Sequence, residues 1–253
     1  MAEVERGKLA LVTGSTSGIG FGIAKALLEN GYHVLLNGRD NTKAQQALKA
    51  LAEYADRITL VIADTTTEQG VQTIQSAVQA LAKPLDVLVT NVGSGRAAND
   101  ICVGAAAYRQ MFDINFYSAV NVCEALLPYL ARPSAIICIS SIAGVAPIGA
   151  PIPYACAKSA LNMFVKEWAV RLAEQKIRIN SLSPGNVMFE GSVWHKKYQE
   201  NTEKTQTYIQ NNVPLNDFVT PQELGEMVLQ MATSPMLTGQ NIVIDGGQSR
   251  GMS

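Results

Sequence analysis

The stretch Leu9-Ala10-Leu11-Val12-Thr13-Gly14-Ser15-Thr16-Ser17-Gly18-Ile19-Gly20 joins a short apolar run to the beginning of a segment with helical spacing. A glycine-rich turn between a strand and a helix lets backbone N–H groups approach a pyrophosphate, whose charge the helix N-terminus stabilises. The turn therefore predicts a dinucleotide site, although a purely structural turn is the alternative for this motif alone. The candidate cofactor contacts in it are Gly14, Thr16, Ser17, Gly18, Ile19 and Gly20.

Outward from this turn, short β-rich runs alternate with longer segments whose apolar residues recur at helical spacing. Such alternation predicts a parallel sheet covered by helices on both faces. No linker-like stretch divides the 253 residues, so we expect a single doubly wound α/β domain of the Rossmann type over 1–253, with seven strands. The expected strands are 8–13, 33–37, 58–63, 85–90, 135–140, 177–183 and 241–245, and the expected helices are 18–30, 41–53, 67–82, 106–130, 154–175 and 221–233.

The composition argues against several classes of protein. Twenty basic and 21 acidic residues leave a net charge of −1, which gives no general attraction for nucleic acid. No run of about 18 apolar residues is present to span a membrane. The stretch from Met1 to Lys8 leads into a strand and not into a signal-peptide core, so a cytoplasmic protein is expected.

The histidines and cysteines form no recognisable metal-binding pattern. The chain has two histidines and four cysteines, and the cysteines lack C-x-x-C spacing, so we expect no metal site. The cysteines lie in apolar stretches and are interpreted as buried thiols: Cys102, Cys123, Cys138 and Cys156.

The end of the second predicted strand bears on which dinucleotide would bind. In the common dinucleotide fold an acidic residue there accepts hydrogen bonds from the 2′-hydroxyl of the adenosine ribose. Gly38 stands in that place, and the neighbouring Arg39 could bind a 2′-phosphate. NADP is therefore expected in preference to NAD. NAD stays open, because Arg39 could be an ordinary solvated arginine or be partly neutralised by Asp40.

Three side chains near the start of predicted helix 154–175 are candidates for acid/base chemistry. Tyr154 and Lys158 are four residues apart, which puts them on one face of a helix. A neighbouring ammonium favours the phenolate and so lowers the pKa of a tyrosine. Ser141 follows the fifth predicted strand, at the sheet edge where open α/β folds bind ligands, and could polarise a carbonyl. Taken singly, a tyrosine and a lysine at this spacing more often lie on an exposed helix face, and a serine after a strand is more often an ordinary turn hydroxyl.

Together these motifs resemble the short-chain dehydrogenase/reductase family. The turn 13–20, Asn115, Ser141 and the Tyr154 to Lys158 pair follow the family's order and spacing. The resemblance covers essentially the whole chain. Its further matches are Asp64, Asn91-Val92-Gly93, Pro184-Gly185 and Asp245-Gly246-Gly247.

The resemblance implies an enzyme that transfers a hydride between a nicotinamide and a carbonyl or secondary alcohol. Tyr154 would exchange the proton and Ser141 would orient the carbonyl. Lys158 would lower the pKa of Tyr154 and bind the nicotinamide ribose, while Asn115 would hold a water of a proton relay. The family also implies a homo-oligomer, a tetramer or dimer, with helices 106–130 and 154–175 at the interface.

Further cofactor contacts are implied by position in the family pattern. They are Asp64 and Thr65 at the adenine, Asn91 and Gly93 at the adenosine-side ribose, and the backbone around Pro184, Gly185 and Val187 at the carboxamide. Phe189 stands where the family usually has a threonine that binds the carboxamide.

The sequence indicates the substrate less clearly than the fold or the cofactor. Overall likeness favours a 3-oxoacyl-carrier-protein reductase; a dehydrogenase of a surface-sugar pathway and a regulator that binds NADP without chemistry are the alternatives. Residues 189–214 are expected to form a substrate lid, in which Trp194 and His195 receive a polar substrate or simply pack. Arg96, near the predicted mouth, suits a phosphate or carboxylate or is an ordinary exposed arginine.

Overall fold

Seven parallel strands form the sheet, in the order β3-β2-β1-β4-β5-β6-β7. This computed structural model describes residues 7–249, and Met1 to Arg6, part of the N-terminal stretch interpreted above, lies outside them. The predicted fold class is confirmed. The strands are β1 (Leu9–Val12), β2 (His33–Gly38), β3 (Ile58–Ile62), β4 (Leu85–Thr90), β5 (Leu130–Ile139), β6 (Ile177–Pro184) and β7 (Asn241–Ile244).

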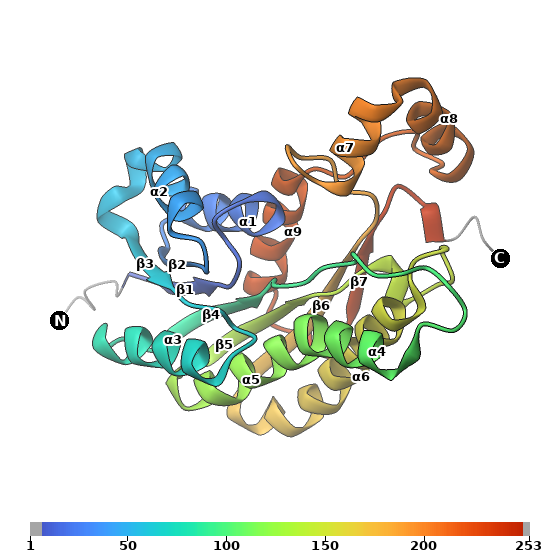
Figure 1. The fold of residues 1–253 in the computed structure, drawn as a ribbon. Helices are drawn as coiled ribbons and strands as arrows, with labels where there is room; N and C mark the ends of the chain where they lie inside the picture. Colours follow the sequence, from blue (N-terminus) through green and yellow to red (C-terminus); the bar gives the residue numbers. More distant parts are fainter. Residues whose placement is uncertain (1–6, 250–253) are drawn as a thin grey trace.

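Helices cover both faces of this sheet (Figure 1). One face packs against α1, α2 and α9, and the other against α3, α5 and α6. Among residues 7–249 no helix is long and apolar enough to cross a lipid bilayer. The helices are α1 (Gly18–Glu29), α2 (Asn41–Ala50), α3 (Glu68–Ala80), α4 (Gly104–Phe112), α5 (Ser118–Leu126), α6 (Ile152–Leu172), α7 (Val193–Glu200), α8 (Thr202–Asn212) and α9 (Pro221–Thr233).

The central strands β1 and β4 are mostly apolar because both faces of the sheet are covered. Leu11 of β1 pairs with Leu35 of β2 and Leu88 of β4, and all three side chains are fully buried. On α1, Ile23 and Leu27 lie four residues apart and are buried against one face of the sheet. A leucine buried in this way contributes about 1.5 to 3 kcal/mol relative to an exposed one, so the central strands form a rigid base for the loops at their carboxyl ends.

The strand order places a crevice where ligands bind in open α/β sheets. Connections leave β1 toward β2 on one side and β4 toward β5 on the other, so the order reverses between β1 and β4. Ligands bind outside the carboxyl ends of the strands at such a point. The segments that follow β1, β4 and β5 all end at this edge, which brings the turn 13–17, residues 91–95 and Ser141 together.

The segment predicted as one helix over 106–130 differs from the prediction. It contains α4, a π-helical segment at Asp113–Tyr117 and α5, followed by a 3-10 turn at Leu127–Tyr129. Strand β5 then begins at Leu130, earlier than the expected start at 135. The pairing of β4 with β5 shifts between Leu85 and Val87, so the residues around Pro133 bulge and interrupt the apolar pattern on which the prediction relied.

The interpretation of the cysteines is correct for two of the four. Cys123 and Cys138 are buried, whereas Cys102 and Cys156 are exposed. Cys102 lies in the loop between β4 and α4. Cys156 is two residues beyond Tyr154 on α6, which turns it away from the face that carries Tyr154 and Lys158.

Candidate active site

The glycine-rich turn presents the N-terminus of α1 with its first N–H groups uncapped. Gly14 and Gly18 have φ values of +61° and +57°, which favour glycine. Ser17 is the N-cap residue, yet its side chain makes no capping hydrogen bond. Ser15 fixes the turn from below, donating from Oγ to Val12 O (2.7 Å) and accepting from Asn37 N–H (2.9 Å). The turn therefore fits an anionic group such as a pyrophosphate.

The end of β2 has no room for an acidic side chain. A Cβ added to Gly38 would lie 2.6 Å from Thr16 Cγ2. The adjacent Arg39 is exposed, and its Nη1 lies 3.4 Å from Asp64 Oδ2. Asp40, which the sequence left open as a partner of Arg39, caps α2 by accepting from Lys43 N–H (3.1 Å), and the carboxylate that contacts Arg39 is Asp64.

Asp64 is therefore the carboxylate beside Arg39. Its Oδ1 accepts from Thr66 N–H (3.0 Å) and Oγ1 (2.7 Å). Partial burial raises the pKa of Asp64, but the hydrogen bonds from Thr66 and the guanidinium of Arg39 outweigh it and hold the pKa below its usual value. The neighbouring Thr65 is buried and its Oγ1 has no hydrogen-bond partner among the described residues. An exposed cation and an ionised carboxylate thus flank the outer end of the crevice.

Asn91 braces the glycine-rich turn from β4. Its Nδ2 donates to Thr13 O (3.0 Å) and Gly14 O (3.1 Å), and its backbone N–H donates to Thr13 Oγ1 (2.9 Å). The side-chain NH₂ of Asn91 is therefore committed to holding the turn.

Helix α6 and strand β5 bring Tyr154, Lys158 and Ser141 together. Lys158 is 2% exposed. Its Nζ donates to the backbone oxygen of Ile139 (2.9 Å), which is the last residue of β5. Its Nζ lies 6.0 Å from the centroid of the Tyr154 ring. Tyr154 hydrogen-bonds with Ser141, whose Oγ also accepts from Ala143 N–H (3.1 Å). The three predicted groups therefore form one cluster.

The acidities in this cluster follow from burial. Burial lowers the pKa of Lys158 to about 8. Burial also raises the pKa of Tyr154, and the hydrogen bond with Ser141 lowers it only in part. The expectation of a depressed tyrosine pKa is therefore wrong for this structure. The ammonium of Lys158 is directed to a carbonyl oxygen, so desolvation of the phenol dominates.

Asn115 links the π-helical segment to the segment after β4. It is fully buried, accepts at Oδ1 from Ser94 N–H (2.9 Å) and donates from Nδ2 to Ser94 O (3.0 Å) and Met111 O (3.0 Å). A Cβ on Gly93 would lie 2.8 Å from Asn115 Oδ1 and 3.1 Å from Lys158 Nζ. A Cβ on Gly95 would lie 3.5 Å from Tyr154 Cε1. Residues 93–95 therefore run directly past Asn115, Lys158 and Tyr154.

The carboxyl end of β6 leads into the segment expected to be a lid. Pro184 ends β6, Gly185 N–H donates to Ile244 O (2.8 Å), and Val187 forms a β-bridge with Val219. The chain between them forms α7 and α8, which stand away from the sheet in Figure 1. Phe189 lies against the glycine-rich turn, since a Cβ on Gly18 would be 2.5 Å from its Cε2.

The sequence left the roles of Trp194, His195 and Arg96 undecided, and the structure shows what surrounds each of them. Trp194 packs against Tyr208 (ring centroids 5.0 Å apart) and Phe218 (5.8 Å). His195 Nδ1 accepts from Gly191 N–H (3.1 Å) at the start of α7. Arg96 is exposed, one residue beyond Gly95. These contacts favour the packing interpretation for Trp194 and His195.

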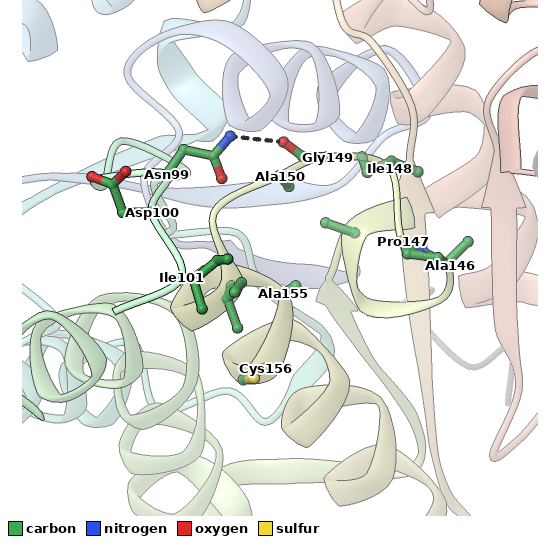
Figure 2. A pocket seen from close by; sticks show the side chains of 12 residues that line it. Asn99, Asp100, Ile101, Ala146, Pro147, Ile148, Gly149, Ala150, Ala155 and Cys156 are labelled. Atoms are coloured by element: carbon green, nitrogen blue, oxygen red, sulfur yellow. Dashed lines mark hydrogen bonds between the residues drawn. The ribbon is translucent and has the colours of Figure 1, made fainter. Parts of the chain in front are cut away.

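An apolar cavity of about 380 Å³ lies beside the cluster of Ser141, Tyr154 and Lys158 (Figure 2). Asn99 Nδ2 donates to Gly149 O (3.1 Å), which ties together the two loops that line it. Ala143 and Ala155 line it, whereas Ser141 and Tyr154 do not. The cavity thus begins next to Tyr154 along the chain, on the side of α6 that carries Cys156.

Three contacts within the candidate site could not be assigned from the sequence. The roles of Ser94, Thr13 and Phe189 depend on partners far along the chain. The only local signals were the position of Thr13 at a strand end and the phenylalanine in place of a usual threonine. In the part of the chain that the structure describes, no group of three His, Cys, Asp or Glu side chains is arranged to hold a metal ion.

Comparison with known proteins identifies the family of this chain. A family model described as enoyl-(acyl carrier protein) reductase, one of the short-chain dehydrogenase/reductase models, matches residues 14–249. The chain belongs to the short-chain dehydrogenase/reductase family. Membership places it among the oxidoreductases that act on alcohol and carbonyl groups.

Relatives and solved structures match over nearly the full length. The chain is 31% identical to the 3-oxoacyl-[acyl-carrier-protein] reductase FabG of Chlamydia trachomatis over 247 residues, 96% of this chain and 97% of that one. The structure of L-sorbose reductase from Gluconobacter frateurii with NADPH and L-sorbose has a TM-score of 0.89 at 27% identity, covering 96% of each chain. The RhlG/NADP complex of Pseudomonas aeruginosa has a TM-score of 0.88 at 28% identity, covering 97% of each chain.

Proposed function

We propose that the protein is an NADP(H)-dependent oxidoreductase that interconverts a carbonyl and a secondary alcohol, with Tyr154 as the proton donor and acceptor. One observation carries this proposal. Tyr154 hydrogen-bonds with Ser141 above the buried Lys158, at the same sheet edge as an uncapped, glycine-rich helix N-terminus. A proton donor beside an anion-binding turn is the arrangement that a nicotinamide dinucleotide and a carbonyl require.

The residues at the crevice fit NADP. Gly14, Gly18 and the first N–H groups of α1 would hold the pyrophosphate, and Arg39 would bind the 2′-phosphate because Gly38 leaves no acid at the end of β2 itself. NADP(H) in several solved relatives supports this assignment. The other proposed contacts are Thr16, Ser17, Ile19 and Gly20 in the turn, Asp64 and Thr65 at the adenine, Asn91 and Gly93 at the ribose, and Pro184, Gly185 and Val187 at the carboxamide.

The chain's own residues supply binding and proton transfer, while the bound nicotinamide supplies or accepts the hydride. In reduction, Ser141 Oγ hydrogen-bonds the substrate carbonyl oxygen and Tyr154 donates its phenolic proton to that oxygen. In oxidation, Tyr154 takes the proton back. Because burial raises the pKa of Tyr154, the phenol is protonated near neutral pH, as a proton donor must be.

Lys158 and Asn115 would assist the proton transfer by Tyr154 without contacting the substrate. Lys158, with its pKa lowered to about 8, carries its charge near neutral pH and can draw the phenol toward ionisation as Tyr154 releases its proton. Asn115 acts through Ser94, which fixes residues 93–95 beside Tyr154. The water that the family places at Asn115 would complete a relay from Lys158 to solvent.

Two substrate classes have specific support. A 3-oxoacyl thioester is favoured by the FabG relative and by the apolar cavity next to Ala155, which could receive an acyl chain. A ketose or other polar carbonyl is supported by the likeness to the L-sorbose reductase complex. A regulator without chemistry is disfavoured by the assembled Ser141, Tyr154 and Lys158 cluster.

Oxidation of NADPH by the purified protein separates these possibilities. We expect loss of absorbance at the nicotinamide band with acetoacetyl-coenzyme A and a slower loss with L-sorbose. Turnover of L-sorbose alone would assign the polar class. Binding of NADPH with no turnover across both substrates and further ketones would instead support the regulator. The cytoplasm, where NADPH is available to such an enzyme, is the proposed compartment.

A further inference from the structure

The phenyl ring of Phe189 packs against Gly18 in the glycine-rich turn, the turn proposed above to hold the cofactor pyrophosphate. Gly18 is the first residue of α1. A Cβ there would lie 2.5 Å from Phe189 Cε2 and 2.6 Å from Cζ, so the ring edge packs directly onto the glycine backbone. Ile19 and Phe189 both pack against the same buried apolar cluster.

The backbone of Phe189 is part of the turn that begins α7. Ser192 N–H donates to Phe189 O (3.0 Å), and Phe189 N–H donates to Ser192 Oγ (3.4 Å). The same Oγ caps α7 by accepting from His195 N–H (2.9 Å). The position of the ring is therefore tied to the position of α7.

The segment that carries α7 and α8 is held together internally and clamped at its base. Trp194 packs on Tyr208 and Phe218, which joins α7, α8 and the chain after α8. At the base, Met188 N–H donates to Val219 O (2.9 Å) and Val219 N–H donates to Asn186 O (2.9 Å). A segment built in this way can move as a unit about residues 188 and 219.

We propose that Phe189 couples occupancy of the cofactor site to the position of the α7–α8 segment: the ring rests on Gly18 without cofactor, and the pyrophosphate displaces it and moves α7. The proposal rests on the proposed NADP-dependent function. It makes Phe189 a positioning residue that weakens cofactor affinity, because binding must first break the contact between Phe189 and Gly18.

The chain contains a natural reporter for this movement. Its two tryptophans are Trp168, which packs against Phe164 in α6, and Trp194 in α7. In a Trp168→Phe background, emission reports Trp194 alone. NADP⁺ is the probe, since it lacks the reduced nicotinamide band that would quench tryptophan by energy transfer. Calorimetric titration of the same samples gives Kd independently of emission and of turnover.

We expect NADP⁺ to change Trp194 emission with the Kd found by calorimetry. Phe189→Thr should lower that Kd roughly three- to tenfold and reduce the emission change to less than half, because the ring no longer competes for Gly18 or moves α7. Phe189→Leu, which keeps an apolar but shorter side chain, should give a Kd and an emission change between those of the parent protein and Phe189→Thr. Phe218→Leu is the matched control: it alters the basal emission of Trp194 but should leave the Kd unchanged.

Three results would overturn the coupling. They are an unchanged or raised Kd in both Phe189 variants, an emission change that persists undiminished in them, or no emission change in parent protein that calorimetry shows to bind NADP⁺. Absence of NADP⁺ binding to the parent protein is a different result, because it would overturn the proposed function and this coupling with it.

Discussion

The side-chain amide of Asn115 bonds both backbone groups of Ser94, accepting from its N–H at 2.9 Å and donating to its carbonyl at 3.0 Å. This pairing sets the path of residues 93–95 past Lys158 and Tyr154. The π-helical turn that contains Asn115 also aims the amide at Met111 O (3.0 Å). A buried amide with both ends satisfied thus positions the wall of the candidate active site.

Replacement of Asn115 should loosen this wall. Asn115→Ala leaves the backbone groups of Ser94 unpaired, so we expect a loss of about 2 to 4 kcal/mol in unfolding free energy and a roughly 10- to 100-fold lower kcat. Asn121→Ala, at an exposed asparagine on α5, is the control. Denaturant melts and steady-state rates check this; a variant as stable and active as wild type would show that the pairing is dispensable.

Arg39 should set the preference for NADP. Removing a charge-assisted contact to a 2′-phosphate in Arg39→Ala should raise the Kd for NADPH roughly 10- to 100-fold and leave the Kd for NADH nearly unchanged. Arg171, an exposed arginine paired with Glu167 on α6, provides the control variant Arg171→Ala. Calorimetry with both cofactors is the measurement. Equal weakening of NADPH and NADH would place Arg39 outside the 2′-phosphate site.

Burial of the charged Lys158 ammonium should lower the free energy of unfolding at neutral pH. Its pKa in the folded protein, about 8, lies below its ordinary value of 10.5, so between these values the unfolded chain binds more protons and stability rises with pH. The cost of the charged form below pH 8 is on the order of 3 kcal/mol. Lys158→Met removes it but leaves Ile139 O unpaired, so we expect a net gain of about 1 to 2 kcal/mol at pH 7.

The pH dependence distinguishes this cause from simple repacking. The stability advantage of Lys158→Met over the wild-type protein, both without cofactor, should fall from pH 7 and change sign by about pH 10, as measured by chemical denaturation across that range. Parallel stability curves for the two proteins would refute the assigned charge burial.

A stripe of exposed apolar side chains on α6 predicts self-association. Ile152, Met163 (56% exposed) and Val170 (77%) recur at spacings that place them on one helical face. Since large exposed apolar patches mark interfaces, we expect a dimer or tetramer. A Met163→Glu/Val170→Glu double variant should sediment as a smaller species, whereas Met236→Glu, at a methionine 92% exposed elsewhere, should not. A wild-type monomer at micromolar concentration would contradict this interface.

The sequence was sufficient for several elements whose signal is periodic or local. The strand run at Leu85–Thr90 and the helix at Pro221–Thr233 were predicted with the bounds observed, because apolar spacing and a proline at the first helical turn mark them. The spacing of Tyr154 and Lys158 likewise placed both on one face of α6.

The features that the sequence did not predict depend on tertiary contacts, which no local pattern encodes. The early start of β5 follows from a slip in its pairing with β4. The carboxylate that contacts Arg39 is Asp64, 25 positions away, whereas the sequence offered only the adjacent Asp40 as an open alternative. The raised pKa of Tyr154 reflects the burial of its phenol and the direction of Lys158 Nζ, neither of which spacing reveals.

The role of Tyr154 is tested most directly by single-turnover reduction of the preferred substrate by wild-type and Tyr154→Phe proteins, each preloaded with NADPH. The variant keeps the ring beside Gly95 and removes only the phenolic hydroxyl. We expect the rate of NADPH oxidation to fall at least about 10³-fold, with the Kd for NADPH changed less than about threefold. A variant that reduces the substrate at the wild-type rate would contradict Tyr154 as the proton donor.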